Sequence, residues 1–97
     1  MSQVTLYESG FHKIIWHPSE GYLEDLWTPQ TEMMNPEQYK QKMIQYRDMV
    51  EKYAAPKALI TLVEFYFPIA PDIQTWVDNN VMIVTKKYIK KAAFVMP

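Results

Sequence analysis

The chain has 97 residues, of which 48% are apolar and 14% aromatic, and its ten Lys and Arg residues nearly balance eleven Asp and Glu residues. This length supports a single domain, residues 1–97, and the aromatic content argues against intrinsic disorder. A net charge of −1 and a pI near 6.1 argue against nucleic-acid binding, and the absence of cysteine excludes disulfides, thiolate metal sites and a cysteine nucleophile. No stretch is apolar enough for a signal peptide or a membrane span, so we expect a cytoplasmic protein.

The first third of the sequence predicts a three-stranded antiparallel meander. Short runs rich in β-branched and aromatic residues are separated by Ser9-Gly10 and by the segment from Pro18 to Gly21, both of which are typical of turns. The expected strands cover residues 3–8, 11–17 and 22–28.

A helix is predicted to follow at Asn35-Pro36-Glu37-Gln38, where an N-cap, a proline at the first helical position and a capping-box Gln stand in order. Apolar residues then recur at helical spacing, which defines one buried face: Tyr39, Met43, Tyr46, Val50 and Tyr53. Pro56 ends the pattern, because the residue before a proline avoids the α region.

The last part of the chain predicts two further strands around a second helix. Residues 57–63 are continuously apolar, as in a central strand buried on both faces. An aromatic loop, 65–71, leads to a helix that begins at Pro71, with Ile73, Trp76, Val77 and Val84 on its buried side. Asn79-Asn80 could break this helix, and the segment Val81-Thr85 fits a strand by composition and a helix by context. A final strand over 91–96 completes the order β-β-β-α-β-α-β, an α/β class with a mixed sheet.

Three segments together suggest a family: "NPEQYKQKMIQYRDMVEKY", "PKALITLVEFYFPIAPDIQTWV" and "KKAAFVMP". With the N-terminal meander, they resemble STAS-like domains, specifically the bacterial branch similar to anti-sigma-factor antagonists and related in fold to CRAL-TRIO lipid-transfer domains. The resemblance implies a mixed sheet with helices mainly on one face. It also implies a closing helix after the last strand, which is not present in this sequence. Members of the family carry a phosphorylatable Ser or Thr after the central strand, whereas residues 64–69 of this chain contain neither Ser nor Thr.

Two groups of residues are candidates for binding. The loop after the strand 57–63 and the helix that follows form a candidate partner or ligand surface: Glu64, Phe65, Tyr66, Phe67, Asp72 and Gln74. Glu64 is expected at the carboxyl end of a parallel strand, where open α/β sheets place ligands. Four lysines form a candidate basic patch: Lys86, Lys87, Lys90 and Lys91. The patch could bind phosphate or an acidic partner, or the lysines could simply stabilise the negative end of a helix dipole.

The two histidines and the early carboxylates give little sign of chemistry. His12 and His17 are five residues apart on one strand, so they should face opposite sides of the sheet, as surface residues or in cross-strand pairs. Nothing indicates that Glu20, Glu24 and Asp25 form a catalytic carboxylate pair. We expect no metal, no cofactor and no catalytic residue.

The sequence therefore predicts a non-enzymatic regulatory module that binds a protein partner. The alternative is a small carrier for an apolar or lipid-like ligand, as the CRAL-TRIO relationship implies. Two helices should cover little more than one face of the sheet, so we also expect a homodimer, formed through the open face or edge.

Overall fold

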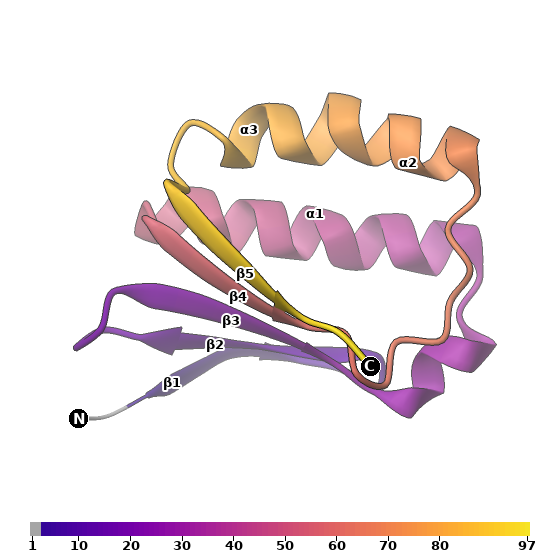
Figure 1. The fold of residues 1–97 in the computed structure, drawn as a ribbon, viewed down its shortest axis with the longest axis horizontal. Coiled ribbons are helices and arrows are strands. Elements are labelled where there is room, and N and C mark those ends of the chain that lie inside the picture. Colours follow the sequence, from indigo (N-terminus) through magenta and orange to yellow (C-terminus); the bar gives the residue numbers. More distant parts are fainter. Residues whose placement is uncertain (1–2) are drawn as a thin grey trace.

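The computed structural model describes residues 3–97 as one five-stranded mixed sheet with helices on one of its faces (Figure 1). The strands are β1 (Val4–Glu8), β2 (His12–His17), β3 (Tyr22–Trp27), β4 (Lys57–Thr61) and β5 (Lys91–Val95), and they lie side by side in chain order. The predicted meander, the mixed sheet and the one-sided helices are confirmed.

The pairing changes from antiparallel to parallel in the middle of the sheet. The pairs β1–β2 and β2–β3 are antiparallel, whereas β3–β4 and β4–β5 are parallel. Strands β3, β4 and β5 therefore run in the same direction. The helical segments are the two connections that these parallel pairs require. The carboxyl ends of β3, β4 and β5 consequently meet at one edge of the sheet.

Helix α1 (Pro36–Tyr53) begins where the sequence predicts. The Asn35 side chain accepts a hydrogen bond from the Gln38 backbone N–H at 2.8 Å, and the Gln38 side chain accepts one from the Asn35 N–H at 2.9 Å. At the other end Ala54 adopts a left-handed conformation with φ of 47°. A short 3-10 helix, η1 (Pro29–Met33), precedes α1 and was not predicted.

The second helix is longer than expected. α2 (Pro71–Val77) continues through a π-helical turn, η2 (Asp78–Met82), into α3 (Ile83–Thr85). The expected break at Asn79-Asn80 is therefore wrong, because a π-helical turn accommodates these residues and the Asn80 side chain donates a hydrogen bond to the Trp76 carbonyl at 2.8 Å. Residues 81–85 are helical.

The core lies between the sheet and α1. Ile14 and Leu23 of the sheet are fully buried, as is Val50 of α1, and Tyr39, Met43 and Tyr46 are nearly so. Two expectations are corrected here. β4 ends at Thr61 and buries mainly its helix-facing residues, Ala58 and Ile60. Trp76 is only partly buried, with the Lys40 Nζ 5.4 Å from its ring, whereas Ile73 and Val77 are buried as predicted.

No helix within residues 3–97 combines the length and the apolar character that a membrane crossing requires.

Candidate functional site

A cavity of about 580 Å³ lies between the sheet and the helices. Its floor is formed by the helix-facing residues of β3 to β5 and the residue after β4: Asp25, Trp27, Ile60, Leu62, Ala92 and Phe94. Its walls come from α1, the loop after β4 and the second helix, including Tyr39, Met43, Tyr46, Phe65, Ile69, Val77 and Met82. The volume falls within the range of about 300–1,000 Å³ that is typical of small-molecule sites, and the lining is mostly apolar with few polar groups, as in such sites.

The cavity opens between β5 and the second helix. Phe94 is 59% exposed, and Ile69 and Met82, which also line the cavity, are exposed as well. Lys86 and Gln74 contribute the exposed polar side chains of this rim. An apolar molecule could therefore enter from the β5 side and cover side chains that are otherwise in contact with water.

A buried histidine–carboxylate pair lies at the inner end of the cavity. His12 Nδ1 and Asp25 Oδ1 are 2.7 Å apart, and the two side chains are 0% and 2% exposed. His12 stacks on Trp27 at a ring distance of 4.4 Å and meets the edge of Tyr7 at 5.5 Å. Asp25 lines the cavity, so it stands between the ligand space and His12.

Burial dominates the electrostatics of this pair. It raises the pKa of Asp25 above its ordinary value, although the hydrogen bond and the charge of His12 act in the opposite direction. Burial, with a contribution from the Asp25 charge, also raises the pKa of Tyr39 to about 12 and raises the pKa of Tyr46. Both phenols therefore stay protonated at neutral pH and remain able to donate hydrogen bonds at the cavity wall.

The two ring nitrogens of His12 differ in their surroundings. Nδ1 is hydrogen-bonded to Asp25 Oδ1, whereas Nε2 is buried and has no hydrogen-bond partner within residues 3–97.

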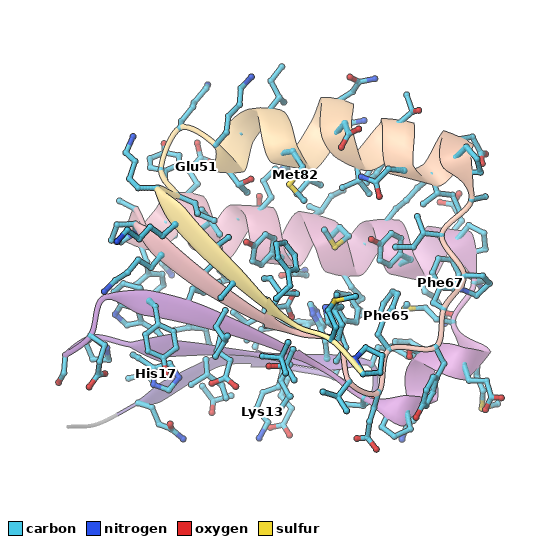
Figure 2. All side chains as sticks on the ribbon, in the orientation of Figure 1. Lys13, His17, Glu51, Phe65, Phe67 and Met82 are labelled. Carbon is cyan, nitrogen blue, oxygen red and sulfur yellow. The ribbon has the colours of Figure 1, made fainter. Side chains whose placement is uncertain are left out.

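His17 makes a second pair on the opposite face of the sheet. Its Nε2 lies 2.9 Å from Glu24 Oε1, and both side chains are partly exposed. Figure 2 shows His17 and Lys13 projecting from the side of the sheet that faces away from the helices. The prediction that the two histidines face opposite sides of the sheet is confirmed, and of the two expected environments, surface or cross-strand pair, the structure shows a cross-strand pair for both.

The predicted loop residues are distributed over different environments. Phe65 lines the cavity, and Phe67 is buried against Tyr39 at a ring distance of 5.0 Å (Figure 2). Tyr66 is 53% exposed, and its backbone N–H donates to the buried Thr31 hydroxyl at 2.8 Å. The loop is thus anchored to η1 through Thr31.

The other predicted residues of this group lie mainly at the surface. Glu64 and Asp72 are exposed, and Asp72 stands in the first turn of α2. Gln74 reaches the cavity rim, where its side chain donates to Asp78 at 3.0 Å. Of the six predicted surface residues, Phe65 and Gln74 border the cavity.

The four lysines do not share a helix face, because α3 ends at Thr85. Lys86 and Lys87 lie in the turn that follows, and Lys91 is the first residue of β5. The backbone N–H groups of Lys90 and Lys91 donate to the Pro56 carbonyl, which fixes the start of β5 beside β4. All four side chains are exposed, and only that of Lys86 lines the cavity. Within residues 3–97, no group of three or more His, Cys, Asp and Glu side chains is placed to hold a metal ion.

Sequence reasoning missed Asp25 and the role of His12. The signal that could have found Asp25 is local: it alternates with Leu23 and Trp27, so it must face the same side of the sheet as these two apolar residues. A carboxylate on an apolar face requires a partner, and the neighbouring strand of the predicted meander carries both histidines, His12 and His17, on opposite faces.

Comparisons of the chain with protein-family models, with curated protein sequences and with solved structures find no match.

Proposed function

We propose that this protein binds a small apolar molecule in the cavity between the sheet and the helices, as a carrier or as the ligand-sensing part of a regulatory module. The observation that carries the proposal is the cavity itself, about 580 Å³ in volume and lined by aromatic and aliphatic side chains around one buried carboxylate. The resemblance to STAS-like and CRAL-TRIO domains noted in the sequence is compatible with such a role.

The contrast between the cavity and the rest of the core supports this proposal. Elsewhere Val50 and Val81 pack with no exposure, as expected of interiors that have few voids larger than a water molecule. The apolar side chains that line the cavity lack neighbouring atoms on one side and so make fewer van der Waals contacts than the rest of the core. A ligand with an apolar body would restore those contacts.

Two variants on neighbouring residues of β5 test the proposal with the dye Nile red as a neutral apolar probe. Ala92 lines the cavity and is exposed, whereas Ala93 does not line it. Ala92→Trp should fill the mouth and weaken Nile red binding about tenfold or more, because the dye loses apolar burial, and Ala93→Trp should leave binding unchanged. Equal effects of the two variants, or no binding to the parent protein, would contradict the proposal.

Native mass spectrometry of freshly purified protein provides an independent test. A carrier should retain ligand from the host cell, which would appear as an additional non-covalent mass on 11.5 kDa. Ala92→Trp should reduce the occupied fraction.

A second candidate function, which we also propose, is an interaction module that associates through β5. One edge of β5 has no neighbouring strand in the sheet, and all five of its residues are exposed. An unpaired strand edge with Phe94, Val95 and Met96 at the surface can pair with another chain, including a second copy of this one. Light scattering over a dilution series tests the homodimer: a mass that stays near 11.5 kDa at all concentrations would contradict it.

A further inference from the structure

We propose that the cavity selects molecules in which the apolar body carries a hydrogen-bond donor, a hydroxyl or an ammonium group, and that Asp25 accepts this hydrogen bond. The inference rests on the proposed function and specifies the chemical class of the ligand. It follows from what surrounds Asp25 and from what is missing around it.

Asp25 has acceptor capacity that the protein does not use. One oxygen, Oδ1, accepts from His12 Nδ1 at 2.7 Å. The Trp27 side chain is a second donor to this carboxyl group. An ionised carboxylate offers about four lone-pair sites, so the two donors leave part of this capacity free. Asp25 lines the cavity while being only 1% exposed, so a ligand in the cavity could provide the missing donor.

His12 holds this acceptor in place. Its ring is fully buried, stacked on Trp27 at 4.4 Å and bonded to Asp25, so the carboxylate has little freedom to turn away from the cavity. A polar group fixed in this way can recognise a ligand without a further loss of side-chain freedom on binding.

The charges around the cavity disfavour a ligand with an anionic inner end. Within residues 3–97, the only lysine or arginine that lines the cavity is Lys86, which lies at the exposed rim. A carboxylate placed near Asp25 would lie in a water-poor space beside another carboxyl group and without a basic side chain to pair with, which is strongly unfavourable. A hydroxyl or ammonium group would instead donate a hydrogen bond to an Asp25 oxygen.

The topology places this recognition point deep in the site. β3 lies two strands inward from β5, where the cavity opens, and neighbouring strands are spaced about 4.8 Å apart. The donor group should therefore enter first and come to lie about 10 Å from the β5 edge, with the apolar body behind it.

Four compounds that share a nine- or ten-carbon alkyl body test the proposal by isothermal titration calorimetry at neutral pH: decan-1-ol, decylamine, decanoic acid and methyl decanoate. We expect decan-1-ol or decylamine to bind the parent protein about tenfold or more tightly than methyl decanoate, which has no donor. Decanoic acid should bind most weakly. The relative affinities of the alcohol and the amine show which of the two donors the site prefers.

The Asp25→Asn variant locates the effect, and Glu24→Gln, the adjacent carboxylate on the opposite face, is the matched control. Asp25→Asn should reduce the advantage of the preferred donor compound over methyl decanoate, because an amide oxygen is a weaker acceptor than a carboxylate, and should strengthen the binding of decanoic acid, whereas Glu24→Gln should change neither. If Asp25→Asn does not fold, the ranking of the four compounds on the parent protein still decides the question.

Each result has a distinct meaning. Equal affinities for all four compounds, or tightest binding of decanoic acid, would overturn the role of Asp25 and leave the apolar cavity as a binding site. A donor preference that persists unchanged in a folded Asp25→Asn variant would also overturn it. No binding of any of the four compounds would overturn both this inference and the proposed function.

Discussion

Strands β2 and β3 carry two histidine–carboxylate pairs, one on each face of the sheet. His12 and Asp25 are 2.7 Å apart and almost completely buried beneath α1, whereas His17 and Glu24 are 2.9 Å apart and partly exposed on the open face. Both pairs stack the histidine on an aromatic ring, Trp27 in the first case and Tyr22 in the second. The two pairs are therefore similar in chemistry and differ mainly in their contact with water.

This difference agrees with the binding role that we propose for Asp25. An exposed pair keeps much of its hydration and contributes little to stability. A buried pair loses hydration, and replacing it by apolar residues is often neutral or stabilising. The core would therefore be satisfied by apolar residues at positions 12 and 25, and a carboxylate that lines the cavity is better explained by what the cavity binds.

The largest effect is expected from removing one partner of the buried pair. His12→Ala should lower the free energy of unfolding by about 3–5 kcal/mol, because it leaves the Asp25 carboxylate buried without its donor and opens space beside Trp27. The total stability of such a domain is about 5–15 kcal/mol, so the variant should be severely destabilised in urea unfolding. A change below about 1 kcal/mol would show that water already hydrates Asp25.

Replacing both partners together separates structure from function. The His12→Leu/Asp25→Leu double variant should be as stable as the parent or gain about 1–4 kcal/mol, since no charge is left unpaired. It should also lose any preference for decan-1-ol over methyl decanoate. Urea unfolding and calorimetry on the same preparation check both statements, and a double variant that is much less stable than the parent would mean that the pair is needed to hold the fold.

A smaller effect is expected in the pH dependence. Burial raises the pKa of Asp25 in the folded protein, so the folded state holds this proton more tightly than the unfolded state does. The contribution of Asp25 to the free energy of unfolding is then fully present below its unfolded pKa and is lost as the pH rises through the folded pKa. Between pH 4 and pH 7, the parent should therefore lose stability relative to Asp25→Asn, whereas the opposite trend would mean that the hydrogen bond from His12 outweighs burial.

The smallest effect is expected on the open face. His17→Ala should change the free energy of unfolding by about 1 kcal/mol or less, because its partner Glu24 can be hydrated once the histidine is removed. Urea unfolding of this variant beside His12→Ala gives the comparison directly. Similar losses for the two variants would contradict the assignment of different roles to the two pairs.

The sequence predicted those parts of the fold that are determined locally. α1 begins at Pro36 because Asn35 and Gln38 form a capping box, and its buried face follows from spacing alone. The strand bounds were predicted to within about two residues, because runs of β-branched and aromatic residues end at local turn signals. The π-helical turn at Asp78–Met82 was not predictable, because two asparagines favour a break by propensity and tertiary packing of Val81 against the core holds the helix together.

The cavity could not be predicted from sequence because it depends on the distance between two layers. Phe65 was identified as a candidate, but Asp25 and Tyr46 belong to elements far apart in the chain and converge only in the folded sheet and helix. The pairing of His12 with Asp25 depends on the register of β2 on β3, where His12 lies opposite Trp27 and Ile14 lies opposite Asp25. Periodicity gives the face of each residue and leaves this register undetermined.

Methionine methyl NMR during a titration with decan-1-ol tests the ligand site most directly. Met43 and Met82 line the cavity from α1 and from the second helix, whereas Met33 lies in η1, is 83% exposed and does not line it. We predict that decan-1-ol shifts the methyl resonances of Met43 and Met82 together, with a common saturation point, and leaves that of Met33 unchanged. Saturating shifts confined to Met33, or no saturating shift at Met43 and Met82, would contradict the account.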